Sequence, residues 1–202
     1  MGIFDKLKIK INGVNSSFPI NLDQVSTNLW QKINKNWDFE DPLLLFCIIT
    51  GKDYKEVCNQ KVEQKSFETI VKVTNWLYRY VIIDEKGKKV FGFPEIPIPS
   101  QILGIEVPKL VGEKTSTMSK ITMGQVFLNN KVYSDTDNIQ TKISLLVANV
   151  MQPLQNDKNE WDSAKVYELE KQILNLPITQ TFPLAVFFCE KFPNFVMRGL
   201  KY

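Results

Sequence analysis

The alternation of apolar and polar positions predicts that the chain begins with β-structure and then turns to helix. Apolar and lysine residues alternate over Leu7–Ile11, as in a half-buried strand. Asn12-Gly13 is a strong turn signal, so we expect residues 18–22 to return as a second short strand. Asp23 is the predicted N-cap of a following helix. The apolar face of this helix comprises Val25, Leu29, Trp30 and Ile33.

Three further helices are predicted before residue 81. Leu43–Ile49 is apolar almost all round, which indicates a helix central to the core, opened by Asp41-Pro42 and ended by Gly51. Asp53 is positioned to cap a second helix, and a long amphipathic third is expected from Ser66 to about Tyr80. The apolar residues that this third helix presents are Phe67, Ile70, Val71, Trp76 and Leu77.

The middle of the chain, residues 81–111, is β-prone and contains several prolines. Two apolar runs, 81–83 and 90–93, flank a polar loop with a glycine, which predicts a hairpin. The prolines that follow favour an extended piece, after which residues 102–107 are expected to give one more strand. Residues 115–119 are rich in hydroxyl side chains and are typical of a linker.

The pattern after residue 120 is almost entirely helical. Thr122 is the predicted cap of a helix to about Tyr133, and further helices are expected over Asn138–Met151 and Trp161–Leu174. A last helix is predicted from about Thr181 to Glu190. This start would place Pro183 in the first turn, where proline is tolerated.

Two pairs of similar segments are separated by the same number of positions. Ile20–Val25 and Ile121–Val126 share an outline that ends in Gln-Val, and their starts are 101 positions apart. The same offset places Leu44–Cys47 on Leu145–Ala148, both apolar. A constant offset suggests an internal duplication. The alternative is two ordinary pairs of amphipathic helices, because few residues are identical.

These patterns predict an α+β, mainly α-helical fold with two similar helical modules. We expect the first module, with its N-terminal β segment, at 1–80, a β-rich insert and linker at 81–119, and the second module at 120–202.

Composition restricts the function further. The chain has 202 residues, 44% hydrophobic content and a net charge of +3, typical of a globular protein with no marked preference for nucleic acid. No apolar run approaches a membrane span and no signal peptide follows Met1, so a cytoplasmic protein is expected. The three cysteines are scattered, which favours free thiols over disulfides. Histidine is absent, which removes the commonest general base and most catalytic zinc sites.

No catalytic, cofactor or metal motif is complete. In Gly112-Glu113-Lys114-Thr115, Glu113 separates the glycine from Lys-Thr, unlike in a phosphate-binding loop. The carboxylate pairs Asp84-Glu85 and Asp135/Asp137 stand in polar turns and are expected to be solvated; the second could bind a divalent cation weakly. We therefore expect no enzyme, no cofactor and no metal site. The remaining candidates for nucleic-acid contact are weak: Lys86, Lys88, Lys89 and Lys109.

Two short motifs resemble a known family. Ile49-Thr50-Gly51 followed by Glu56-Val57 is similar to the L-T-G-x-x-x-E-E-h layout of bacteriophage tail assembly chaperones, where h is apolar. Ile121-Thr122-Met123-Gly124-Gln125 resembles the h-T-h-G-Q/D helix entry of those proteins and related phage structural-module proteins. One module per chain is usual there, whereas two are expected here, and Gln152-Pro153 stands where the second Thr-Gly would be. The resemblance covers roughly two-thirds of the chain as short motifs.

The resemblance implies a non-enzymatic role in phage tail assembly, in the host cytoplasm or in the virion. Family members engage tail tube or tape-measure proteins. The first alternative is a neck or ring component of the virion that self-assembles as a homo-oligomer. The second alternative is a nucleic-acid-associated phage protein. Aromatic residues are the expected anchors for a protein partner, with burial in the core as the competing interpretation. The candidates are Trp30, Trp37, Trp76, Trp161, Phe187, Phe188, Phe192 and Phe195.

Overall fold

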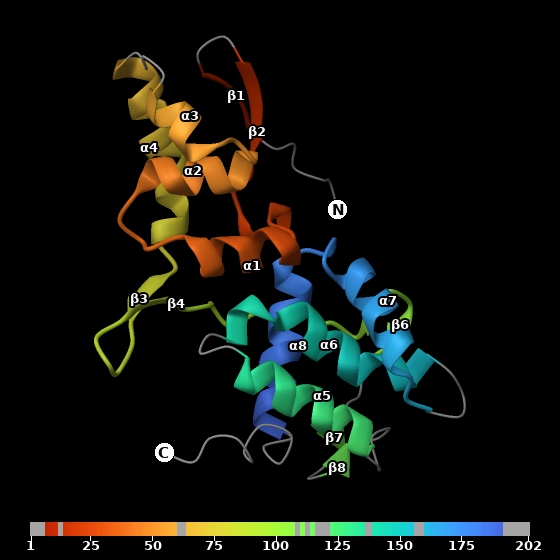
Figure 1. Cartoon of the computed structure of the whole chain (residues 1–202). Coiled ribbons are helices and arrows are strands. Elements are labelled where there is room, and N and C mark those ends of the chain that lie inside the picture. Colours follow the sequence, from red (N-terminus) through yellow and green to blue (C-terminus); the bar gives the residue numbers. More distant parts are fainter. Residues whose placement is uncertain are drawn as a thin grey trace. The chain divides into compact units, whose positions relative to one another are not determined.

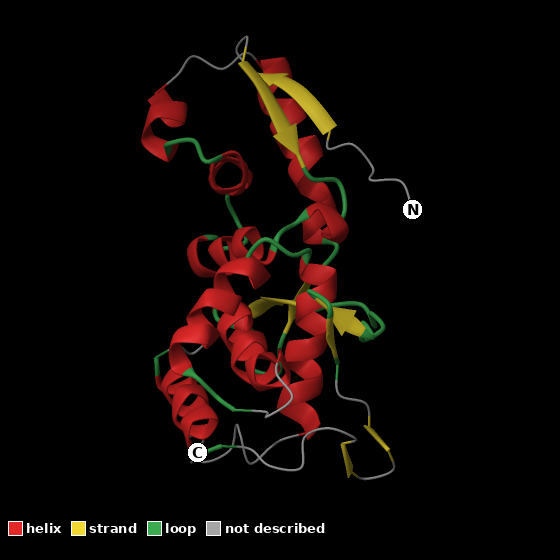
Figure 2. Ribbon diagram, turned by 90° about the vertical axis from the view of Figure 1, so that its right-hand side faces the viewer, coloured by secondary structure: helices red, strands yellow, loops and turns green. Residues whose placement is uncertain are grey.

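The computed structural model shows an α+β fold that is mainly α-helical (Figure 1). It describes residues 7–11, 14–59, 64–107, 110–111, 114–115, 122–135, 139–155 and 160–191. Within these residues the strands form four separate two-stranded antiparallel hairpins and no larger sheet (Figure 2). No helix in the described part combines the length and the apolar character needed to cross a membrane.

The chain divides into two compact units, each of them discontinuous in sequence. Unit 1 comprises residues 1–25 and 32–96, and unit 2 comprises residues 26–31 and 97–202. The boundary therefore passes through helix α1, Thr27–Asn36. Residues 81–119, expected to be a separate insert, are shared between the two units in this division.

Unit 1 contains two hairpins and three helices besides its part of α1. Strands β1, Leu7–Ile11, and β2, Val14–Phe18, pair with Leu7 opposite Phe18. The prediction of a return strand over 18–22 is wrong, because β2 ends at Phe18 and a 3-10 turn, η1 at Leu22–Gln24, follows. The remaining elements are α2 at Pro42–Thr50, α3 at Tyr54–Asn59, α4 at Gln64–Tyr78, β3 at Val81–Ile83 and β4 at Lys89–Phe91.

Local capping signals define the helix ends of unit 1. The Asp41 carboxylate accepts hydrogen bonds from the backbone N–H groups of Leu43 and Leu44 at 2.8 and 3.1 Å, with Pro42 in the first turn. Gly51 ends α2 at φ 70°, a conformation that glycine adopts without strain. Asp53 accepts from Glu56 N at 2.8 Å, as predicted for the start of α3. These caps were all visible in the sequence.

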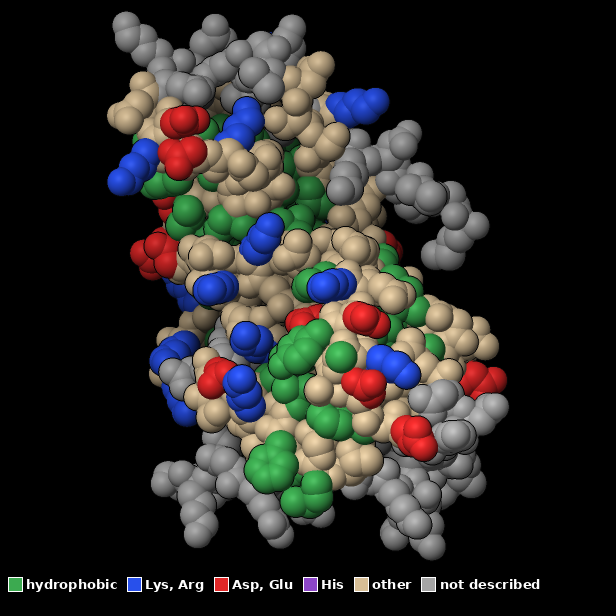
Figure 3. Space-filling view, turned by 45° about the vertical axis from the view of Figure 1, so that its right-hand side comes forward, with side chains coloured by type: hydrophobic (Ala, Val, Ile, Leu, Met, Phe, Trp, Pro, Cys, Tyr) green, Lys and Arg blue, Asp and Glu red, His purple; other side chains and the backbone are tan. Residues whose placement is uncertain are grey.

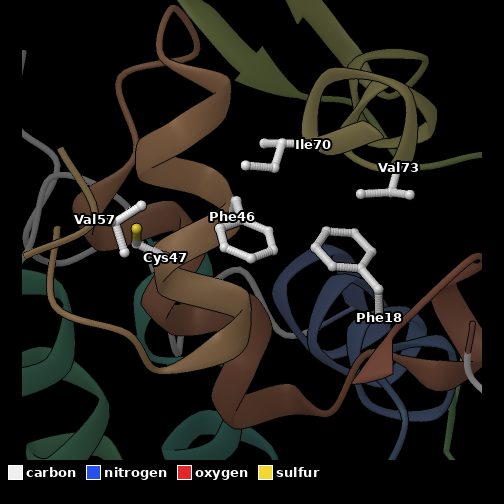
Figure 4. Close-up of a cluster of buried hydrophobic side chains, with 6 residues drawn as sticks. All are labelled: Phe18, Phe46, Cys47, Val57, Ile70 and Val73. Carbon is white, nitrogen blue, oxygen red and sulfur yellow. The ribbon is translucent and has the colours of Figure 1, made fainter. Parts of the chain in front are cut away.

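Side chains from four elements form a hydrophobic cluster in unit 1 (Figure 4). Phe18 from β2 stacks on Phe46 from α2 with ring centroids 6.3 Å apart, and both are almost completely buried. Cys47, Val57, Ile70 and Val73 complete the cluster. Helix α2 thus contributes to the core, as expected, but only Leu45, Phe46 and Cys47 of its residues are buried. On α4, Ile70 and Leu77 face inward while Phe67 and Val71 are exposed.

Unit 2 is built around α6, Ile143–Met151, whose nine residues are all buried. Helices α5, Met123–Ser134, α7, Ser163–Ile173, and α8, Ile178–Lys191, all contact α6. The short helices η2, Ile139–Thr141, and η3, Gln152–Gln155, flank α6 at its two ends. The small hairpins of unit 2 are β5, Gln101–Ile102, with β6, Ile105–Glu106, and β7, Leu110–Val111, with β8, Lys114–Thr115.

The first residues of α1 are hydrogen-bonded to a segment far along the chain within unit 2. Thr27 N and Asn28 N donate to Leu176 O and Leu174 O at 2.8 and 3.0 Å. The hydroxyls of Thr27 and Thr181 lie 2.8 Å apart in the interior. Asp23 is not the cap of this helix, contrary to prediction; it lies inside η1, and Ser26 Oγ accepts from Leu29 N at 3.2 Å.

Three boundaries in unit 2 differ from those predicted. Residues 102–107 form a tight hairpin rather than one strand, because Leu103 and Gly104 adopt φ values of 51° and 77° that turn the chain. Helix α6 begins at Ile143, after η2, and not at Asn138, which lies outside the described residues. Helix α8 begins at Ile178, so Pro183 lies inside the helix instead of in its first turn.

The proposed repeat is reproduced only locally. Asn21 Oδ1 accepts from Gln24 N, and Thr122 Oγ1 accepts from Gln125 N, both at 3.2 Å. Helices α2 and α6 are both nine residues long at the same offset. However, the first capped turn is a three-residue 3-10 helix, whereas the second opens the twelve-residue α5. An internal duplication is therefore not shown.

Candidate protein-binding surface on α5

Helix α5 starts with a complete capping box. Thr122 Oγ1 accepts from Gln125 N, and Gln125 Oε1 accepts in return from Thr122 N at 3.0 Å. Two backbone donors that would otherwise lack partners are satisfied in this way. The start of α5 is therefore well defined, and its faces are fixed from the first turn.

The face of α5 that points into unit 2 carries two amide side chains over its first two turns, followed by the buried Val132. Gln125 and Asn129, one turn apart, are 1% and 3% exposed. Asn149 of α6 donates from Nδ2 to Gln125 O at 2.9 Å and to Asn129 Oδ1 at 2.8 Å. Gln125 Nε2 donates to Asn149 O at 3.0 Å. Because these amides are buried and bonded, they hold α5 in one orientation on α6.

Trp161 completes this network. Its indole Nε1 donates to Asn149 Oδ1 at 2.8 Å. Its ring lies against Gly124, where an added Cβ would come within 2.3 Å of Cζ3. The absence of a side chain at Gly124 is thus what lets the ring pack directly on the α5 backbone. We call Gln125, Asn129, Asn149 and Trp161 the amide network.

The face of α5 that points outward is apolar. Met123 and Phe127 are each 69% exposed and lie one helical turn apart. We call these two side chains the α5 ridge. Hydrophobic side chains also gather on part of the surface of the chain seen in Figure 3. Helix α5 therefore buries two amides beside Val132 and turns its two most exposed apolar side chains outward, unlike an ordinary amphipathic helix.

Most of the described aromatic residues predicted as anchors lie in the interior. Trp30, Trp37, Phe187 and Phe188 are between 0% and 7% exposed. Trp76 and Trp161 are half-buried, whereas Phe192 and Phe195 lie outside the described residues. The buried four act as packing residues in this structure, and a role for them in binding stays a prediction.

Trp37 illustrates how these aromatic residues pack within unit 1. Its ring contacts Phe39, Tyr78 and Phe91, with centroids 4.9, 5.0 and 5.8 Å away. Its Nε1 donates to Asp41 O at 2.9 Å, so the polar end of the indole is also satisfied.

Sequence reasoning missed the α5 ridge. Its signal was that α5 has no clear apolar stripe: Met123 and Phe127 alternate around the helix with Gln125 and Asn129. Such a pattern indicates either a poorly amphipathic helix or one whose polar side is buried, and the sequence does not distinguish them.

The lysine candidates lie on the hairpin of β3 and β4. Lys86, Lys88 and Lys89 are exposed, and Lys89 Nζ forms an ion pair with Glu40 Oε1 at 3.1 Å. Asp84 Oδ1 accepts from the backbone N–H groups of Lys86 and Lys88 at 2.9 and 2.8 Å, so it shapes the turn. Lys109 lies outside the described residues.

The described residues contain no group of three or more potential metal ligands among His, Cys, Asp and Glu. Burial, with a smaller contribution from nearby Cys58, raises the pKa of the Cys47 thiol to about 11. A hydrogen bond to Asp41 raises the pKa of Tyr54. Both groups are therefore protonated at neutral pH, and a protonated thiol is a poor nucleophile.

Comparisons with models of protein families, with curated proteins and with solved structures find no match to this chain.

Proposed function

We propose that this chain acts by binding another protein through the α5 ridge, without catalysis. The observation that carries the proposal is the outward-facing pair Met123 and Phe127, each 69% exposed, on a helix that buries amides in their place. An exposed large apolar side chain is unremarkable alone, but two of them one turn apart on a helix that buries Gln125 and Asn129 require a reason.

A rigid helix that presents a pair of apolar side chains is suited to docking. The amide network fixes the backbone of α5, so little conformational entropy is lost when a partner binds. Burying both side chains of the ridge would contribute about 3 kcal/mol. Methionine and aromatic side chains are also favoured at protein interfaces. The expected partner surface is an apolar groove or helix face with a polar rim.

We infer from the resemblance in sequence that this binding serves bacteriophage tail assembly, with a tail tube or tape-measure protein as the partner. Four residues of the h-T-h-G-Q entry that carries part of the resemblance, Thr122–Gln125, form the start of α5. Its threonine and glutamine form the capping box, and its glycine receives the Trp161 ring. The motif therefore builds the helix start on which the ridge is displayed, and this supports a binding role. A self-assembling virion component is the alternative.

The test compares partner capture by three forms of the tagged full chain from its native lysate. The double variant M123S/F127S removes the ridge, whereas Y167S removes a 45% exposed aromatic residue from α7 in the same unit. We expect the wild type and Y167S to recover the same tail or other virion protein, and M123S/F127S to lose at least nine-tenths of it. Equal recovery by all three forms would rule out the ridge as the binding surface.

The two assembly roles differ in what remains in the finished particle. An assembly chaperone is expected to be missing from purified virions, whereas a structural component is present in fixed stoichiometry. Quantitative mass spectrometry of purified particles measures this directly.

A further inference from the structure

Helix α4 of unit 1 carries apolar side chains on its exposed face as well as on its buried face. Ile70 and Val73 point from α4 into the hydrophobic cluster of unit 1 (Figure 4), and Leu77 is also buried. Outside this buried face, Phe67 and Val71 are 47% and 38% exposed. They are four positions apart and therefore neighbours one helical turn apart. We call Phe67 and Val71 the α4 pair.

Three cations run along α4 beside this pair. Lys65 and Lys72 are exposed residues of the helix, seven positions apart. Seven residues make almost two full turns, so the two side chains lie on one line about 10.5 Å apart. Arg79, seven positions further on, is exposed in the turn that ends α4, where its N–H donates to Trp76 O at 3.4 Å. It extends the line of positive charge beyond the helix.

These three cations have no ion-pair partner among the described residues, where the ion pair found joins Lys89 to Glu40. Glu68 lies four positions before Lys72, a spacing at which opposite charges on a helix often pair. Its carboxylate instead accepts a hydrogen bond from Gln64 Nε2 at 3.0 Å. The charges of the line are therefore available to a partner.

We propose that this face of α4 docks an acidic amphipathic helix of another protein. The α4 pair would lie against the apolar stripe of that helix, since apolar anchors three or four positions apart are how helices dock. Carboxylates seven positions apart on the partner recur at the same interval of about 10.5 Å as the cations of α4. The surface belongs to unit 1, whereas the α5 ridge belongs to unit 2, so this inference does not rest on the proposed function.

The composition of the face favours an acidic helix over other anionic partners. Glu68 lies within one turn of both Lys65 and Lys72 and would repel a phosphate backbone. Attachment to a membrane surface increases with the apolar area that is buried, and two partly exposed side chains supply little of it. A protein helix can place its carboxylates opposite the cations and an uncharged residue opposite Glu68.

The first experiment measures binding of the full chain to a fluorescently labelled synthetic helix by fluorescence anisotropy. This acidic peptide has a leucine stripe and glutamates seven positions apart, and a twin peptide has lysines in place of the glutamates. We expect the acidic peptide to bind with an affinity that falls as salt is added, and the lysine twin not to bind. A wild-type chain that does not bind the acidic peptide overturns the proposal.

An exchange of charge separates docking on α4 from a loss of folding. K65E/K72E/R79E should bind the acidic peptide at least tenfold more weakly and should bind the lysine twin in its place, which a misfolded chain would not do. The control K165E/K171E reverses two exposed cations of α7 in unit 2 and should leave binding unchanged. Binding of the acidic peptide that survives K65E/K72E/R79E overturns the proposal.

The α4 pair and the other anionic partners are tested in the same assay. F67S/V71S keeps the cations and should weaken binding of the acidic peptide at least tenfold, because the apolar contact is lost. Duplex DNA, and vesicles of phosphatidylcholine with phosphatidylserine, then replace the peptide, and we expect both to bind more weakly than the peptide does. If either bound more tightly, and lost that binding in K65E/K72E/R79E, the surface would serve that partner and the proposal would be overturned.

Discussion

Helices α5 and α7 pack against the same central helix, α6, by different means. Helix α7 turns three apolar side chains inward, Val166, Leu169 and Ile173. It has one side-chain hydrogen bond to α6, from Ser144 Oγ to Glu170 Oε1 at 2.9 Å. Helix α5 buries one apolar side chain, Val132, and turns two amides inward to hydrogen bonds with Asn149. Apolar burial is proportional to area and tolerates small rotations, whereas hydrogen bonds require defined distances and angles. A helix positioned by its amides therefore has its apolar residues available for another purpose.

The largest effect is expected from N149L, which removes the three hydrogen bonds made by the Asn149 side chain and leaves the one from Gln125 Nε2 to the backbone carbonyl. Asn129 Oδ1 and Trp161 Nε1 would lose their partner in the interior, and each unsatisfied buried group costs about 1–3 kcal/mol. We expect the free energy of unfolding to fall by about 4 kcal/mol, measured by urea denaturation. If the free energy of unfolding fell by less than about 0.5 kcal/mol, as for a surface substitution, the amide network would not hold α5.

The matching change in α7 is L169A. Leu169 is 1% exposed, and truncating a buried leucine leaves a cavity that costs about 3 kcal/mol. The control is E168A on the same helix, which is exposed and should change stability by less than about 0.5 kcal/mol. If L169A were as mild as E168A, the packing of α7 would not be of the ordinary apolar kind.

G124A tests the contact between α5 and Trp161. Alanine usually stabilises a helix interior relative to glycine by about 1 kcal/mol. Here its Cβ would come within 2.3 Å of the Trp161 ring, so a net loss of about 2 kcal/mol is expected. The double variant G124A/W161L removes most of the clash and should show a positive coupling energy in a double-mutant cycle. Additive effects would contradict the contact.

The smallest effect on stability is expected from F127S. A side chain that is 69% exposed contributes little to the fold, so the free energy of unfolding should change by less than about 0.5 kcal/mol. Its solubility should rise, because an exposed apolar residue is removed. A large destabilisation measured by thermal unfolding would mean that Phe127 packs within the chain and does not belong to an exposed ridge.

Local signals in the sequence predicted those features that depend on a few neighbouring residues. Asp41-Pro42, Gly51 and Thr122 define helix ends by hydrogen bonds and backbone angles within one turn. The mainly helical fold and the β3–β4 hairpin were predicted for the same reason. The inward-facing amides of α5 were not predicted, because Gln125 reaches a partner 24 positions away. Whether an amide faces inward depends on such a distant partner, and periodicity carries no information about it.

Leu103 is a second feature that the sequence pattern did not predict. Its φ of 51° is rare for a leucine, and it turned an expected strand into a hairpin. No propensity favours that conformation at leucine, since it is imposed by the pairing of β5 with β6.

The attachment of Thr27 to Leu176 and Thr181 also has a consequence for the order of events during synthesis. The two ends of this contact are 149 positions apart, so the start of α1 leaves the ribosome long before its partners exist. Unit 1, residues 1–25 and 32–96, is complete in sequence before Leu176 is made and can fold in that interval. Unit 2 cannot be completed until α8 is made. A fragment starting at residue 97 would lack residues 26–31, which supply the bridge from Ser26 to Pro177 and the first turn of α1. Hydrogen bonds that span 149 and 154 positions thus complete unit 2 last.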